Sequence, residues 1–471
     1  MSFVTNIDPA LTRPDQIVLE NLFQDIHRRK TSSITEETKQ AKTFTPQSKP
    51  EKEVTQPAPN GGYTTSKTRD DTDLTILKSF NGPTNPSFEP TIFTIWNATD
   101  IHPSLNKYII RPYTHLATTI LRHPTDVVFL SHILLYTTTI LPSAIYLFIP
   151  GNFTWIHGVL HTVFTMWCAG PFTLMLHNHI HNNGILRKDS LVCRWLDWAF
   201  PYVLEPLMGH TWDSYFYHHV KHHHVEGNGP NDLSSTVRYQ RDDPWHFAHY
   251  FFRFFLLIWA DLPLYFLRKK KPGLALRAFL SEVISYAFYF TMTYYLSPHA
   301  STFVFLIPFA LLRVGLMVGN WGQHALVDEI EPDSDFRSSI TLIDVAVSML
   351  IPIATKDHSD PLTHLQSNRH SFNDGYHTAH HLNPLRHWRD QPSHFLASKT
   401  AYSQGRALVF HDIDYIMLTI KLLSKDYSYI ARRFVPISEE QAGMTVGEVE
   451  AILKTKVRKF SKEEINGKWK A

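Results

Sequence analysis

Long apolar runs separated by short polar connections are the main pattern of the chain after its first hundred residues. Four of these runs are close to the roughly 20 residues that an α-helix needs to cross a bilayer: Val127–Ile149, Phe153–Leu176, Arg277–Leu296 and Thr302–Gly319. A fifth run, Phe247–Leu267, contains charged residues and a proline, and we expect it to lie in the membrane interface. The pattern predicts an all-α integral membrane protein with four transmembrane helices.

Short connections pair these runs into two hairpins. Residues 150–152 read Pro-Gly-Asn, and residues 297–301 read Ser-Pro-His-Ala-Ser. Neither connection contains Lys or Arg, whereas the opposite ends of the hairpins are rich in both. Because basic residues gather on the cytosolic side of membrane proteins, we expect both termini and a helical cap in the cytosol. The alternative is a soluble protein with long buried helices, against which four such runs argue.

Polar segments flank the apolar part. Residues 1–95 are rich in Thr, Ser, Pro, Lys, Glu and Asn, which predicts a disordered N-terminal arm with a short helix near Gln16–Arg29. We expect a membrane domain over residues 100–430 and a charged C-terminal tail over residues 431–471. Two charged residues inside the apolar runs, Glu282 and Arg313, lie near the cytosolic interface, so we expect their side chains to extend to the headgroups.

Composition narrows the class of protein. The net charge is +2, which gives no basic field for nucleic acid. Two cysteines in 471 residues make a disulfide framework improbable. Histidine is abundant, with 29 copies, and it is clustered. We therefore expect the clustered histidines to form the functional site.

Four clusters carry these histidines. The first, His177-Asn-His-Ile-His181, follows the second apolar run, and its outer histidines lie one helical turn apart. His157 and His161 have the same spacing inside that run, and we interpret them as packing residues. The second cluster, His218-His-Val-Lys-His-His-His224, contains both an HxxHH and an HxxxHH pattern starting at His219. Both registers place ligands on one helical face, and the sequence does not choose between them.

The third and fourth clusters lie further along the chain. Asn320-Trp-Gly-Gln-His324 ends the last apolar run, and His377-Thr-Ala-His-His381 is a further HxxHH pattern. With one register chosen in the second cluster, nine histidines result. One zinc takes three or four protein ligands, so nine imidazoles suit two five- or six-coordinate ions that keep open positions. Neutral imidazole suits iron, zinc, copper or nickel, and two iron ions can share the electron demand of activating dioxygen to attack an unactivated C–H bond.

Together these motifs resemble the membrane fatty-acid desaturase and hydroxylase superfamily, over roughly residues 120–390. Asn320 and His324 are similar to an additional element of the acyl-CoA desaturase branch. That likeness implies that His324 binds one iron and that the Asn320 amide holds a water on it. The candidate metal-binding residues are His177, His181, His219, His222, His223, His224, Asn320, His324, His377, His380 and His381.

The resemblance implies a membrane enzyme, expected in the endoplasmic reticulum with its metal site cytosolic, that uses two irons and dioxygen to oxidise a lipid acyl chain. Desaturation is the favoured reaction, and hydroxylation is the alternative. No His-Pro-Gly-Gly haem motif occurs, so electrons are expected from a separate carrier such as cytochrome b5 or a ferredoxin. A histidine-rich membrane metal transporter is the remote alternative, since transporters place their ligands near the bilayer midplane. The substrate, the bond position and the oligomeric state are left open.

Overall fold

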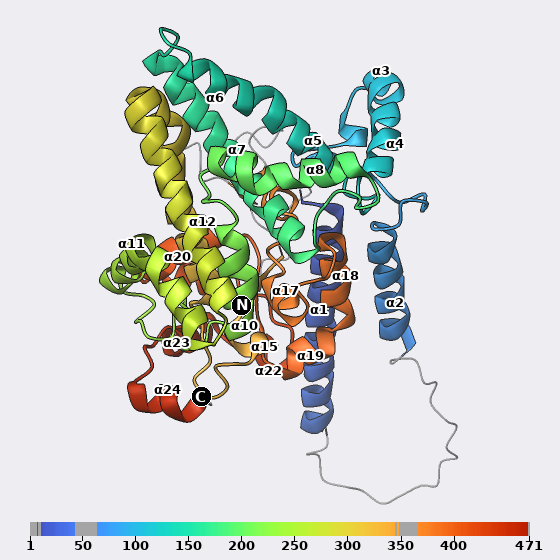
Figure 1. Cartoon of the computed structure of the whole chain (residues 1–471). Coiled ribbons are helices and arrows are strands. Elements are labelled where there is room, and N and C mark those ends of the chain that lie inside the picture. The colour runs from blue at the N-terminus through green and yellow to red at the C-terminus, as the bar shows by residue number, and fades with distance from the viewer. Residues whose placement is uncertain (1–6, 8–10, 43–63, 344–345, 348–364, 470–471) are drawn as a thin grey trace, which may run out of the picture.

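The structure is a computed structural model, and most of the chain is helical (Figure 1). It describes residue 7 and residues 11–42, 64–343, 346–347 and 365–469. Three two-stranded pairings occur among these residues: antiparallel β1 (Thr91–Phe93) with β2 (Trp96–Asn97), parallel β3 (Ile340–Leu342) with β6 (Leu408–Phe410), and antiparallel β4 (Ala346–Val347) with β5 (Leu365–Gln366). The predicted helical class is therefore confirmed, with small strand pairs added.

The first two apolar runs form two antiparallel helices. One is continuous through α5 (Val127–Leu135), the π-helical η3 (Tyr136–Ile140) and α6 (Leu141–Phe148), and the other is α7 (Trp155–His181). Thr154 caps α7 by accepting a hydrogen bond from the N–H of His157. The Ser143 hydroxyl lies 2.8 Å from His157 Nε2 and 2.9 Å from His161 Nδ1. These two histidines thus pack between the helices, as expected.

The last two apolar runs also lie side by side. One is α12 (Pro272–Thr291) with its π-helical extension η6 (Met292–Leu296), and the other runs through α13 (Pro298–Ser301), η7 (Thr302–Leu306) and α14 (Ile307–His324). Tyr289 stacks on Phe305, and Arg313 Nη2 lies 2.8 Å from Glu282 Oε2. The Glu282–Arg313 pair is buried, so the expectation that both side chains extend to the headgroups is wrong. Each charge instead satisfies the other inside the helix pair.

Among the described residues, four helices are long and apolar enough to cross a membrane by length and composition: Val127–Phe148, Trp155–His181, Pro244–Arg268 and Pro298–His324. This set includes α11 (Pro244–Arg268), which we expected in the interface, and leaves out α12. Both ends of α11, however, contact the histidine-bearing segments. The Tyr250 hydroxyl accepts a hydrogen bond from the Asn320 amide at 2.7 Å, and the Tyr265 hydroxyl donates to Glu226 at 2.6 Å. Because a crossing helix would separate its ends by the thickness of the hydrocarbon core, these contacts favour an interfacial α11.

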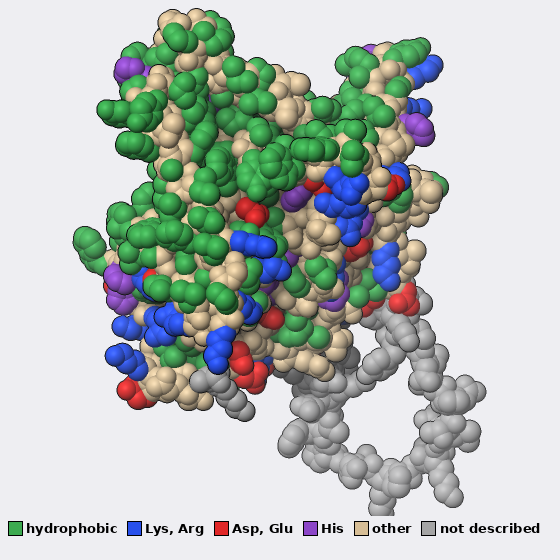
Figure 2. Space-filling view, viewed as in Figure 1, with side chains coloured by type: hydrophobic (Ala, Val, Ile, Leu, Met, Phe, Trp, Pro, Cys, Tyr) green, Lys and Arg blue, Asp and Glu red, His purple; other side chains and the backbone are tan. Residues whose placement is uncertain are grey.

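The surface is divided into a hydrophobic end and a charged end (Figure 2). Figure 2 shows hydrophobic side chains dominating the end that α6, α7 and the end of α12 form in Figure 1, with most charged side chains at the opposite end. Exposed apolar residues of the hydrophobic end include Ile145, Ile156, Leu160, Val163 and Phe290. Large contiguous apolar surfaces mark contact with a membrane or a partner. The structure is therefore that of a membrane protein, and the two-hairpin plan with a cytosolic cap stays a prediction.

The N-terminal segment differs from the expected disordered arm. The helix α1 (Arg13–Lys42) buries Val18 and Leu22 against Tyr376 and Phe395, and α2 (Thr64–Ser79) packs beside it. The predicted helix near Gln16–Arg29 is part of α1. Its apolar residues recur at helical spacing and cover the segment before His377, so burial outweighs the polar composition. Residues 43–63 lie outside the described residues.

The C-terminal segment, which is described to residue 469, is also packed rather than tail-like. The helix α23 (Val446–Lys456) buries Val449 and Leu453, and α24 (Lys462–Lys468) buries Ile465. The guanidinium of Arg241 is buried and donates at 2.9 Å to the carbonyl oxygens of both Ala325 and Lys456. The C-terminal segment is thereby tied to the residue that follows His324.

Short helices complete the fold. Those before the second apolar pair are η1 (Ala98–Asp100), α3 (Pro103–Leu105), η2 (Asn106–Ile110), α4 (Arg111–Ile120), α8 (Leu191–Ala199), η4 (Phe200–Leu204), α9 (Glu205–Leu207), η5 (Phe216–His223) and α10 (His224–Glu226). Those after it are α15 (Asp335–Ser338), α16 (Ser367–His370), α17 (His377–Leu382), η8 (Trp388–Asp390), α18 (Gln391–Ala397), α19 (Lys399–Gln404), α20 (Tyr415–Leu423), α21 (Tyr427–Ala431) and α22 (Glu439–Ala442).

Candidate metal centre

Helix ends and one unusual helix deliver the histidines. His177 and His181 occupy the last turn of α7, His324 ends α14, and His377, His380 and His381 lie on the short helix α17. The second cluster lies on η5, a π-helix in which the N–H of His224 bonds the carbonyl of His219 five residues earlier. Such i→i+5 turns often occur at functional sites. Here the wider turn brings residues four and five apart onto one side.

One group of five imidazoles gathers at the end of α7. His177, His181, His219, His224 and His380 each offer a ring nitrogen, and all five nitrogens lie within 4.8 Å of one another. His380 Nε2 lies 3.1 Å from His177 Nε2 and 2.9 Å from His224 Nε2. His224 Nε2 is 3.0 Å from His219 Nε2. We call this set the first histidine group.

A second group adjoins it. His223, His324 and His381 place ring nitrogens within 4.8 Å of one another. His377 joins them, because its Nε2 lies 3.2 Å from His324 Nε2. We call these four residues the second histidine group. Its rings contact the first group directly: the centroids of His224 and His381 are 5.1 Å apart.

The spacing of these nitrogens fits metal binding. Two nitrogens that bind one ion at right angles, each at about 2.1 Å, lie about 3 Å apart. The observed separations of 2.9 to 3.2 Å have this size. Two buried nitrogens, His181 Nε2 and His381 Nε2, have no hydrogen-bond partner within the described part of the chain. A cation between the rings would satisfy them.

The rings are also in the protonation state that metals require. Burial, reinforced by neighbouring imidazoles, lowers the pKa of His219, His377 and His380 well below the ordinary value for histidine. The pKa of His381 falls to about 3 for the same reasons. Neutral imidazole is the form that binds metal. The cluster is therefore ready to bind cations at neutral pH.

Two of the candidate ligands lie outside both groups. His222 Nε2 accepts the backbone N–H of Leu233 at 2.8 Å, and the ligand atoms of His222 lie within 4.8 Å of those of His218 and Asp232 instead. The amide nitrogen of Asn320 donates to the Ser234 carbonyl at 3.0 Å and to the Tyr250 hydroxyl. The structure thus brings together nine of the eleven candidates, in the HxxxHH register of the second cluster.

Carboxylates lie behind the second group. Asp232 Oδ2 is 2.7 Å from His223 Nδ1, and Asp335 Oδ1 is 3.7 Å from His381 Nδ1. A carboxylate within hydrogen-bond distance of a metal-binding ring, as Asp232 is, fixes the orientation of the ring and raises its basicity. Asp232 follows the second cluster closely in the sequence, whereas Asp335 lies in a polar segment with no motif to mark it.

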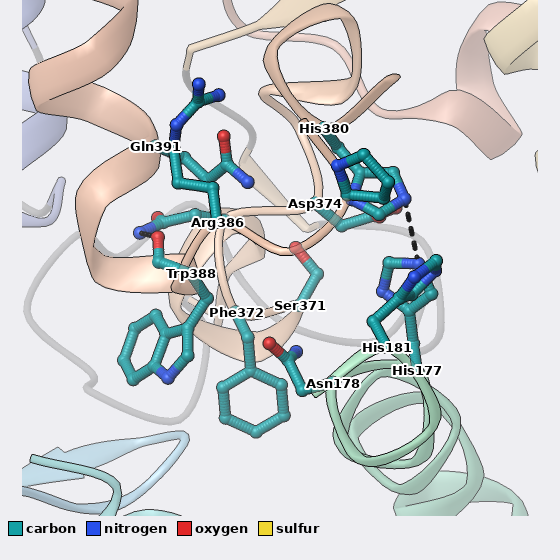
Figure 3. A pocket seen from close by; sticks show the side chains of 12 residues that line it. His177, Asn178, His181, Ser371, Phe372, Asp374, His380, Arg386, Trp388 and Gln391 are labelled. Atoms are coloured by element: carbon teal, nitrogen blue, oxygen red, sulfur yellow. Dashed lines mark hydrogen bonds between the residues drawn. The ribbon is translucent and has the colours of Figure 1, made fainter. Parts of the chain in front are cut away.

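A cavity borders the first group (Figure 3). Its walls include His177, His181 and His380 on one side and Phe372 and Trp388 on the other. Apart from Pro384, the remaining lining is polar, and Asp374 belongs to it. Burial raises the pKa of the Asp374 carboxyl to about 7, although the hydrogen bond from Gln323 at 3.0 Å opposes the rise. A carboxyl that can hold or release a proton near neutral pH thus lies beside the histidines.

Comparison with known protein families agrees with this site. The family model described as fatty acid desaturase matches residues 153–412, which is more than half of the chain and includes every histidine of both groups. The chain belongs to the fatty acid desaturase family. It is accordingly an oxidoreductase of lipid acyl chains that works in a membrane. Neither the curated proteins nor the solved structures include a match to it.

Proposed function

We propose that this protein is a di-iron, dioxygen-dependent acyl-lipid desaturase. The observation that carries the proposal is the convergence of nine imidazoles from four separate segments into two adjoining groups. The first histidine group would hold one iron and the second would hold the other. Iron supplies the redox chemistry of dioxygen, which amino-acid side chains lack.

The overall reaction balances with an external reductant. One dioxygen, two electrons, two protons and a –CH2–CH2– unit give a –CH=CH– unit and two waters. The electrons come from a separate one-electron carrier such as cytochrome b5 or a ferredoxin. The Asp374 carboxyl, which can hold a proton near neutral pH beside the cavity, is suited to deliver one of the two protons.

The positions of the histidines favour an enzyme over a metal transporter. Both groups lie at the ends of the apolar helices α7 and α14 and on the segments that follow them. A transporter holds its cargo near the bilayer midplane. We propose that the site faces the cytosol from the endoplasmic reticulum membrane.

Metal analysis and lipid profiling test the proposal together. Purified protein is expected to contain about two irons per chain, and cells that express it are expected to gain a lipid two mass units lighter than its precursor. His380→Ala, which removes a ring shared by His177 and His224, should abolish that product. The control His115→Ala changes an exposed histidine of α4 and should leave it unchanged. A product sixteen mass units heavier would establish hydroxylation instead, and zinc in place of iron would contradict the proposal.

A further inference from the structure

Helix α8 presents an apolar face to the outside of the protein. Leu191, Val192, Trp195, Leu196 and Trp198 are all exposed, and the Trp195 and Trp198 side chains are exposed by 67% and 58%. The buried residues of the same helix are Cys193 and Asp197. The helix thus reverses the usual arrangement, in which the apolar side faces the core. An exposed face of this kind requires an apolar partner.

Contacts from the buried side of α8 and from the residue that follows it place this helix next to the first histidine group. Asp197 binds the Lys188 ammonium and lies 3.9 Å from His179 Nδ1. The ring of Phe200, which follows α8, stacks on His179 with centroids 4.3 Å apart. His179 lies between His177 and His181 of the first group. The apolar face of α8 therefore lies level with the last turn of α7, where the apolar helix ends.

A basic hollow opens beside the start of α8. It is lined by Arg122, Asn183, Arg187, Lys188 and Asp189. Arg187 is paired with Asp189, and the Arg122 guanidinium donates to the carbonyl oxygens of Asn182 and Asn183. Lys188 is paired with Asp197, so three cations face two acids and the charge of Arg122 is left in excess at the hollow. Figure 2 shows basic side chains directly below the hydrophobic band on the side where Figure 1 places α8.

From these features we propose that α8 lies in the membrane interface and that the Arg122–Arg187–Lys188 hollow binds the headgroup of an anionic phospholipid. Three observations select lipid over a second copy of the chain. The apolar face continues the hydrophobic band of the bundle (Figure 2). Tryptophans are the residues that favour the headgroup level. Basic side chains at the edge of an amphipathic helix attract acidic lipids, and guanidinium groups form paired hydrogen bonds to phosphate.

The depth of α8 can be measured on the full chain in lipid nanodiscs. A spin label on Trp195→Cys should be accessible to dissolved oxygen and shielded from a water-soluble nickel complex. A label on Glu463→Cys, an exposed position of α24, should show the opposite behaviour. The unaltered chain gives the background, since Cys168 and Cys193 are both buried. Shielding of Trp195→Cys from both reagents would indicate a protein partner, and access to nickel would indicate water; either result overturns the proposal.

Headgroup selectivity is a separate measurement that needs no enzymatic activity. Spin-labelled phosphatidylserine should associate with the protein more strongly than spin-labelled phosphatidylcholine. The triple variant R122Q/R187Q/K188Q should lose this preference by several-fold, since each basic residue near a membrane surface adds to it. K454Q/K459Q/K462Q, which removes three exposed lysines far from α8, should keep it. Equal loss in both variants, or displacement of the lipid by soluble phosphate or coenzyme A, would overturn the headgroup assignment.

Discussion

The contacts of His222 and His224 distinguish the HxxHH register of the second histidine cluster from the HxxxHH register. His224 contacts the first group at 3.0 Å, whereas the nearest donor to His222 Nε2 is a backbone N–H. We expect His224→Gln to lower iron binding from about two ions to about one per chain and to abolish activity. His222→Gln, in which the amide oxygen can still accept that N–H, should retain both irons. Iron analysis of the two purified variants checks this, and the reverse result would support the HxxHH register.

Sequence could identify most of these residues but not their grouping. The spacing of His177 with His181 and of His377 with His380 and His381 follows from an α-helical repeat, and it points to one face. The choice between His222 and His224 depends on the π-helical turn of η5. No sequence pattern indicates the extra residue in this turn. The carboxylate of Asp335 reaches His381 only through tertiary packing, so no local pattern could reveal it.

At the scale of elements, the close contact of α14 with α20 positions His324. A methyl group added at Gly322 would come within 2.5 Å of the Tyr415 carbonyl oxygen and 2.9 Å of Thr419 Oγ1. We expect Gly322→Ala to destabilise the protein by about 1–3 kcal/mol and to lower iron content. Gly319→Ala on the same helix meets no atom within 4 Å, so it should be neutral or slightly stabilising. Thermal unfolding in detergent compares the two, and equal effects would contradict this account.

The docking of α1 provides a pH-dependent contact between elements. Asp15 accepts hydrogen bonds from the Tyr376 hydroxyl at 2.8 Å and the Asn368 amide at 3.1 Å, yet burial raises its pKa from 3.8 to about 6. Docking therefore favours the neutral carboxyl. Its contribution is complete below pH 3.8 and is lost as the pH rises through 6, at a cost of at most about 3 kcal/mol.

Hydrogen exchange of α1 measures this loss. After correction for intrinsic rates, α1 should open more readily at pH 7.5 than at pH 5. Asp15→Asn stays neutral at both pH values, so it should remove the difference and protect α1 at pH 7.5. Asp25→Asn on the same helix removes the ion pair with Lys399 and should leave the pH dependence in place. Unchanged pH dependence in Asp15→Asn would contradict the role of this carboxyl.

The elements at the two ends of the chain show where composition misleads. Residues 1–95 look disordered by their polar content, but Val18 and Leu22 are spaced to cover Tyr376 and Phe395. The residues after 431 are rich in charge, but Val449 and Leu453 recur at helical spacing and are buried. In both segments a few apolar positions decide the structure, and an average over the segment hides them. The long apolar helices were predictable because length alone identifies them.

At the scale of the whole molecule, the site restricts the path of the chain through the membrane. His181 at the end of α7 and His324 at the end of α14 belong to adjoining groups, so an even number of crossings must separate them. Three apolar helices intervene or end there: α11, α12 and α14. The two-hairpin plan predicts that α12 and α14, which are joined by Glu282–Arg313 and Tyr289–Phe305, cross as a pair. It also predicts that α11 stays on one side of the membrane, although its length and composition would allow it to cross.

Cysteine labelling of intact microsomes can test this path. The turns that precede α7 and α13 are neighbours, since the Phe153 and His299 rings stack at 5.3 Å, and Asn152→Cys and His299→Cys should react only from the lumen. Lys270→Cys, between α11 and α12, should react from the cytosol, as should Lys462→Cys on α24. If α11 crossed, Lys270→Cys would share the sidedness of Asn152→Cys. The chain would then need another crossing before His324 to form one site, and the two-hairpin plan would fail.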